Sequence, residues 1–128
     1  MTTPLKIDIH FINRLNKAKL LLIYGKNVYD GVIQRFEFTF ELSWKMMKSF
    51  LEYMGIVEIK SPRTTIKAAF SYGLIDDGEQ WIDMMVERNK TSYDEKEVIV
   101  IYEKVKRTYN GRFTNLRKKL EEEISRLK

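Results

Sequence analysis

One stretch of the sequence, from Ile33 to Gly55, carries more large apolar residues at helical spacing than any other part of the chain. The residues that recur every three or four positions share one stripe of a helix, and they are Ile33, Phe36, Phe40, Trp44, Met47, Leu51 and Met54. Others fall on different sides, namely Phe38, Leu42, Met46 and Tyr53. A helix that is apolar around much of its circumference needs several neighbours to cover it. This stretch therefore predicts the central helix of a helical fold.

The segments on either side of this stretch also have helical boundaries. Thr3-Pro4 predicts the start of a first helix that runs to Gly25, and Asn27, Asp30 and Gly31 predict a break before the central helix. Ser61-Pro62 and Gly73 bound a short third helix whose inward residues are Ile66, Ala69 and Phe70.

Two further helices come next, each opened by an acidic capping box. Asp76 with Glu79 predicts the start of a fourth helix, with Trp81, Met84, Met85 and Arg88 on its inward face. Asp94 with Glu97 predicts the start of the last helix, which keeps apolar residues in near-heptad spacing from Val98 to Leu127 and is expected to bend at Gly111. The predicted fold is all-α: an antiparallel four-helix up-and-down bundle with one additional short helix, in a single domain over residues 1–128.

Composition excludes several function classes. The chain has no Cys and a single His, His10, and it lacks a Gly-rich phosphate loop and a His-Glu metal motif, so we expect no metal and no cofactor. No apolar run approaches a membrane span and the N-terminus is too polar for a signal peptide, so we expect a cytoplasmic protein with no membrane partner. The net charge is +5, and residues 104–119 hold seven bases and no acid. That segment could bind nucleotide or RNA phosphates, face solvent, or meet an acidic partner.

The stretch from Glu87 to Asp94, at the junction of the last two helices, is the strongest candidate for a site. Arg88 falls on the inward side of its helix and would need a partner such as Glu41, because an unpaired buried charge is costly. The same turn could instead present Arg88 and Tyr93 to a phosphate group.

Several motifs resemble those of one known family, over nearly the whole chain. They are Arg35 to Lys45 (RFEFTFELSWK), Ser61-Pro62-Arg63, Leu74 to Glu79 (LIDDGE), Trp81 and Glu87-Arg88-Asn89, and together they resemble the nucleotidyltransferase substrate-binding proteins of the HEPN superfamily, which includes HepT-like proteins. The resemblance implies a homodimer that works with a separately encoded minimal nucleotidyltransferase. In such pairs the HEPN member can act as a ribonuclease toxin of a toxin-antitoxin pair, which its partner silences by adding nucleotide to a Tyr.

The chain departs from the family motif at one position. The motif has an Arg, a polar residue, a His a few residues later, and often a Tyr two positions after that His; Arg88 and Asn89 match, but the chain has no His beyond them. Either Tyr93 replaces the His, or the His is deleted and Tyr93 is the motif Tyr. We prefer the deletion because Tyr93-Asp94-Glu95 resembles the residues that come after the His in relatives. Both alignments remove the group best suited to proton transfer near neutral pH.

Two functions are implied by the resemblance. The first is a non-catalytic subunit that docks a nucleotidyltransferase, with Arg88 and Asn89 binding nucleotide or phosphate, Glu41 supporting Arg88, and Tyr93 accepting the modification. The second is a ribonuclease toxin in which Arg88 is catalytic and another residue replaces the His. The missing His favours the first.

Overall fold

In the computed structural model, residues 28–90 and 92–127 are described, and all regular structure within them is helical. The elements are α2 (Val28–Tyr53), α3 (Pro62–Tyr72), α4 (Gly78–Arg88), α5 (Glu95–Lys104), the π-helical turn η1 (Val105–Tyr109) and α6 (Asn110–Leu127). The all-α fold is thus confirmed. The first helix predicted before Gly25 lies outside the described residues.

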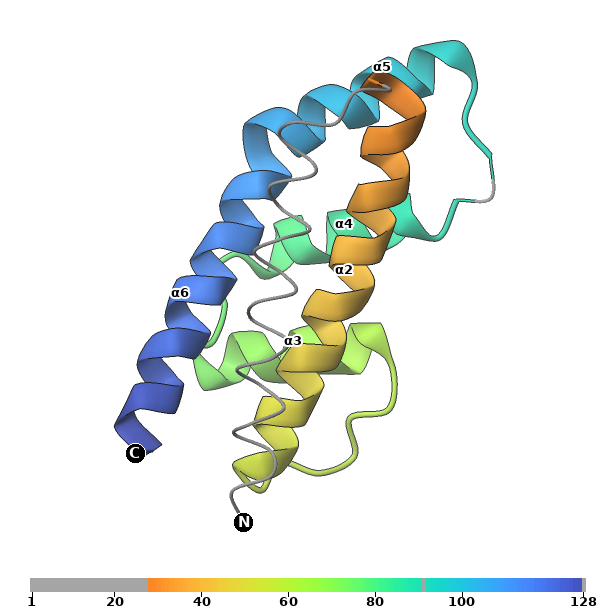
Figure 1. Cartoon of the computed structure of the whole chain (residues 1–128). Helices are drawn as coiled ribbons and strands as arrows, with labels where there is room; N and C mark the ends of the chain where they lie inside the picture. Colours follow the sequence, from red (N-terminus) through yellow and green to blue (C-terminus); the bar gives the residue numbers. More distant parts are fainter. Residues whose placement is uncertain (1–27, 91, 128) are drawn as a thin grey trace.

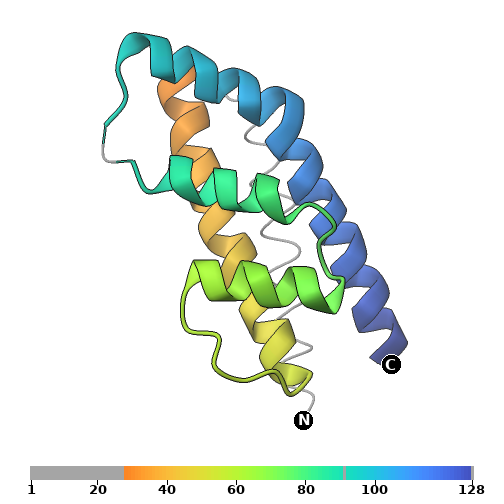
Figure 2. The ribbon, with the colours of Figure 1, turned by 180° about the vertical axis from the view of Figure 1, so that it is seen from behind.

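Two long helices frame the molecule, and two short ones cross between them. Figure 1 shows α2 and α6 running in the same direction, while α3 and α4 carry the chain back from the end of α2 to the start of α5. Seen from behind, α3 and α4 lie one above the other across the long helices (Figure 2). The sequence predicts one short helix, but α4 has 11 residues, as α3 does. The chain therefore returns from the end of α2 to the start of α5 through two short crossing helices.

The predicted central helix is central in the structure. α2 contacts α3, α4, α5 and α6, and buried side chains occupy several of its sides. It begins at Val28, so the predicted break at Asp30 and Gly31 is wrong; one Gly costs a helix only about 1 kcal/mol, which the long buried helix tolerates. Phe38 on α2 and Met54, just beyond the end of α2, are exposed, although the sequence predicts Met54 on the buried stripe.

Aromatic side chains join α2 to the crossing and C-terminal helices. Phe36 of α2 stacks on Tyr109 with ring centroids 5.3 Å apart, and Phe40 lies 6.2 Å from Trp81 of α4. Trp81 in turn meets Phe113 of α6 edge-on at 5.7 Å. All five rings are almost completely buried, so this cluster fixes α4 between the two long helices.

The predicted boundaries of α3 and α5 are confirmed. Ser61 caps α3 and forms a capping box with Thr64, Pro62 is its first residue, and Gly73 ends it in the left-handed conformation with φ 92°. Asp94 and Glu97 form the predicted capping box of α5.

Two predictions about α3 and α4 are wrong. The cap of α4 is Asp77, whose carboxylate accepts from the Gln80 amide at 3.1 Å, and not Asp76. Phe70 is predicted to point inward but is half-exposed. One part of its ring lies over Gly78, where an added Cβ would come within 3.3 Å of the ring. α4 therefore starts one residue later than predicted and approaches α3 closely at this glycine.

The last helix is continuous from α5 through η1 to α6, and its bend is not where the sequence predicts it. Gly111 lies exposed within regular α6, whereas the wide turn η1 at Val105–Tyr109 precedes it. Figure 1 shows the helix changing direction in this region. A π-turn, and not a glycine, accompanies the bend.

Candidate functional site

Arg88, the last residue of α4, pairs across the bundle with α2. Its Nη2 lies 3.0 Å from Glu41 Oε1, and both side chains are about one-third exposed. The partner that the sequence suggests for Arg88 is therefore the one observed. Its Nε is buried, and no acceptor within residues 28–90 and 92–127 bonds to it. The guanidinium therefore keeps one donor that is unsatisfied within the described residues.

Glu87, beside Arg88, is a buried acid held by two lysines. Lys90 Nζ lies 2.9 Å from its Oε1 and Lys104 Nζ lies 3.0 Å from its Oε2, while the Glu87 side chain is only 7% exposed. Burial alone would raise the pKa of Glu87, but the hydrogen bonds and charges of Lys90 and Lys104 outweigh it, and the net pKa is lowered. Glu87 is therefore ionised at neutral pH and is a structural anion.

Lys104 also connects this acid to the aromatic core. Its Nζ lies 3.4 Å from Asp83 Oδ2, and the same carboxylate oxygen accepts a short hydrogen bond from the Tyr109 hydroxyl. Burial, together with the hydrogen bond to Asp83 and its charge, raises the pKa of Tyr109 far above its ordinary value. Tyr109 is thus a neutral hydrogen-bond donor and not a proton-transfer group at physiological pH.

Tyr93 is oriented differently from our expectation. The sequence suggests an exposed hydroxyl, but the ring packs against the core and the hydroxyl donates to the Glu87 carbonyl at 2.6 Å. Lys90 lies over the ring, 5.9 Å from its centroid. Burial and then the nearby charges of Glu37 and Glu87 raise the pKa of Tyr93. A tyrosine with a raised pKa is an even poorer replacement for a catalytic His.

The other predicted site residue, Asn89, forms the C-cap of α4 and its side chain is exposed. Glu41 on α2 thus lies near the junction of α4 and α5, which carries Arg88 and Tyr93. Asn89 belongs to the same turn. We call this group, together with Glu87, the junction site. Within the described part of the chain, no group of three or more His, Cys, Asp or Glu residues could hold a metal ion. His10 lies outside the described residues.

Sequence reasoning missed the acids and bases that organise the junction site. Glu87 and Lys104 are 17 residues apart on different helices, and Asp83 and Tyr109 are 26 apart. No local spacing marks such pairs. The only signal was the mixed charge of the turn itself.

The basic segment 104–119 does not form a uniform cationic surface. Most of its members lie within 4 Å of an acid: Lys104 with Glu87 and Asp83, Arg107 with Glu103, Arg112 with Asp76 and Asp77, Arg117 with Glu121, and Lys119 with Glu123. These pairs weaken the case for broad, sequence-independent RNA binding along α6.

Comparison of the sequence with known protein families identifies the family of this chain. Residues 10–122 match the family described as "Nucleotidyltransferase substrate binding protein like". The chain belongs to this family. A curated relative, "Probable ribonuclease HepT" of Haemophilus influenzae, is 35% identical over 81 residues, which is 59% of this chain and 56% of the relative. The alignment therefore spans little more than half of that protein. Its name agrees with the HepT-like HEPN resemblance found in the motifs.

A solved structure has the same fold. The crystal structure of the protein ttk003001694 from Thermus thermophilus matches with a TM-score of 0.65 and 22% identity, over 91% of this chain and 98% of that one. At this identity the likeness supports the fold alone. No helix among the described residues is long and apolar enough to cross a membrane.

Proposed function

We propose that this protein is the binding partner of a separately encoded minimal nucleotidyltransferase. The nucleotidyltransferase would dock at the junction site of this protein and add nucleotide to Tyr93. The family match over residues 10–122 carries this proposal, because the family is named for nucleotidyltransferase substrate binding. The junction site adds a chemical reason: Arg88 keeps a buried Nε without an acceptor in the described chain, beside a tyrosine on the same turn. Once Tyr93 turns outward, Arg88 on the same turn would help to neutralise an incoming phosphate.

Modification requires Tyr93 to turn outward. Its hydroxyl now donates to the Glu87 carbonyl, so transfer begins with loss of that bond and rotation of the ring away from the core. The phenol oxygen then attacks the α-phosphorus of a nucleoside triphosphate; the new O–P bond forms as the bond to pyrophosphate breaks, and the phenolic proton passes to a base. Since the pKa of Tyr93 is raised, the nucleotidyltransferase must supply that base.

The test is to incubate the protein with the nucleotidyltransferase encoded beside it, ATP and magnesium, and to measure intact mass. We expect a gain of one or more AMP units that is lost in Tyr93→Phe. Tyr53→Phe is the matched control, because Tyr53 is also half-buried but lies at the far end of α2. A gain that persists in Tyr93→Phe would overturn the acceptor assignment, and no gain would leave Tyr93 as a packing residue.

A second candidate function is ribonuclease activity, which the name of the HepT relative favours. Against it stands the chemistry of the junction site: cleavage through the 2′-hydroxyl needs groups with pKa values near neutrality, and the pKa of Tyr93 is raised. We expect little or no cleavage of bulk RNA by the purified protein. Cleavage that survives stringent purification and disappears in Arg88→Ala would instead establish the ribonuclease.

The proposal includes a homodimer. Large apolar side chains stand about half-exposed on α2 and α5, namely Phe38, Ile99 and Val100, and a second copy could cover them. Light scattering at micromolar concentration tests this directly. A mass near the 15.3 kDa of one chain would contradict the dimer.

A further inference from the structure

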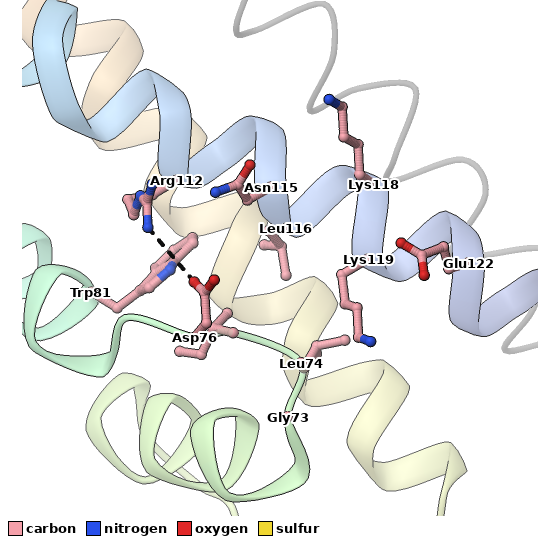
Figure 3. A pocket seen from close by; sticks show the side chains of 11 residues that line it. Gly73, Leu74, Asp76, Trp81, Arg112, Asn115, Leu116, Lys118, Lys119 and Glu122 are labelled. Atoms are coloured by element: carbon pink, nitrogen blue, oxygen red, sulfur yellow. Dashed lines mark ion pairs between the residues drawn. The ribbon is translucent and has the colours of Figure 1, made fainter.

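A separate pocket lies at the opposite end of α4 from Arg88. It occupies about 420 Å³ between the turn that joins α3 to α4 and one side of α6. Its floor is apolar, because Leu74, Trp81 and Leu116 are all buried there. Figure 3 shows the pocket walled by side chains of α6 on one side and by the turn around Asp76 on the other. The volume falls in the range of small-molecule sites, about 300–1,000 Å³.

The α6 wall of this pocket is rich in cations. Arg112, Asn115 and Lys119 are three and four residues apart and therefore share one face of the helix. Figure 3 shows Lys119 extending toward the turn at Leu74, while Arg112 lies over Asp76. Lys118 lines the pocket too, but its side chain extends away from the turn in Figure 3, and Lys119 Nζ lies 3.7 Å from Glu123 Oε2. Two carboxylates, Asp76 and Glu122, line the pocket against these cations. Both carboxylates are exposed at the rim.

Arg112 is held only loosely by its neighbours. Its Nη1 lies 3.6 Å from Asp76 and 3.7 Å from Asp77, beyond the usual hydrogen-bond distance. Asp76 is 85% exposed, and Asp77 already caps α4. Arg112 Nε is buried, and it has no acceptor anywhere in the described part of the chain. The guanidinium is therefore incompletely paired, and because Arg112 lines the pocket, an anion bound there would give it a closer acceptor.

We propose that this pocket binds a phosphate monoester of about the size of a mononucleotide. Arg112 would take two phosphate oxygens with its planar fork, and Lys119 and Asn115 would complete the contacts from the same helix face. Leu74 and Leu116 would contact the apolar part of the ligand. Asp76 would swing into solvent on its exposed side chain when the phosphate replaces it. This site does not depend on the proposed modification of Tyr93.

The experiment is an NMR titration of the full-length, ¹⁵N-labelled protein with AMP, and with adenosine as the phosphate-free control. We expect AMP to give saturable shifts of the Trp81 indole and of amides in residues 112–119, and adenosine to give none. Arg112→Gln should weaken AMP binding at least about tenfold, because the bidentate contact is lost. Arg112→Lys should give a smaller loss, since it keeps the charge but not the fork.

Two further variants make the test specific. Asp76→Asn should strengthen AMP binding by about two- to threefold, because it removes a competing carboxylate at the rim while leaving the Asp77 cap intact. Arg107→Ala is the matched control: Arg107 belongs to the same basic segment but bonds to Glu103 on the surface. Absence of saturable shifts, equal binding of adenosine, or equal weakening by Arg107→Ala and Arg112→Gln would each overturn the proposal.

Discussion

The two ends of α4 hold their charged side chains in opposite ways. At the C-terminal end, Glu87 is buried and two lysines contact it at 2.9 and 3.0 Å. At the N-terminal end, Arg112 meets Asp76 and Asp77 at 3.6 and 3.7 Å, and Asp76 is mostly in water. A buried charge must be closely paired for the chain to fold, whereas a loose pair at a rim can be exchanged at little cost. The first end is thus built for rigidity and the second for exchange.

The strongest test of this contrast is Glu87→Ala. The change removes the buried anion that Lys90 and Lys104 share, while Glu97 and Asp83 still pair with them, so we expect the free energy of unfolding to fall by about 1.5–3 kcal/mol. Urea denaturation followed by circular dichroism measures it. Glu52→Ala is the control, because Glu52 forms an exposed pair with Lys48 and its loss should cost under about 0.5 kcal/mol. Equal effects of the two variants would remove the distinction.

A smaller loss is expected from Tyr109→Phe. The ring would still stack on Phe36, but Asp83 would lose a buried hydrogen-bond donor. We expect about 1–2 kcal/mol of destabilisation in the same urea experiment. Tyr53→Phe should change stability much less, since Tyr53 is only half-buried at the end of α2. If Tyr109→Phe leaves the free energy of unfolding unchanged, the hydrogen bonds of the Tyr109 hydroxyl contribute little to stability beyond the packing of the ring.

Acid should weaken the junction site. The pKa of Glu87 is lowered below its ordinary value of 4.5, so the stabilisation by its ionised form is fully present above about pH 4.5. It is lost as the pH falls through the lower pKa of the folded state. We expect part of the decline in unfolding free energy below pH 4.5 to be absent in Glu87→Gln. An unchanged acid profile in that variant would show that other carboxylates account for the decline.

The smallest expected effect on stability is that of Asp76→Asn. Because Asp76 is 85% exposed and lies 3.6 Å from Arg112, its loss should change the free energy of unfolding by under about 0.5 kcal/mol. Thermal unfolding beside the wild-type protein measures this. A loss comparable to that of Glu87→Ala would mean that the rim pair is structural after all, and that the two ends of α4 do not differ.

The sequence predicts best what neighbouring residues determine. The caps Ser61 and Asp94 act on backbone amides three residues away, and the stripe from Ile33 to Leu51 depends on helical period alone, so both could be predicted. Adjacent Asp76 and Asp77 offer equivalent cap chemistry, and only the packing of α4 selects Asp77.

The polar contacts of the junction site depend on tertiary structure and were predicted only in part. The charge of an inward Arg88 is enough to require an acid, and Glu41 on the central helix was a reasonable partner. The inward turn of Tyr93 depends on where the carbonyl of Glu87 comes to lie, and the burial of Glu87 depends on Lys104 from another helix. Neither contact produces a periodic pattern in the sequence from which it could be predicted.

The π-turn η1 explains an irregularity in the apolar spacing of the last helix. The buried residues Ile101, Val105, Tyr109 and Phe113 succeed one another in three steps of four, which in a regular α-helix would carry the last about 120° around the axis from the first. The wider turn over Val105–Tyr109 compensates for part of this rotation and keeps both halves facing the core. Removing one residue here, for example Lys106, should therefore convert a π-turn to an α-turn without unfolding the helix. The bend is thus a place where the length of the chain can change by one residue while the buried surfaces stay in phase.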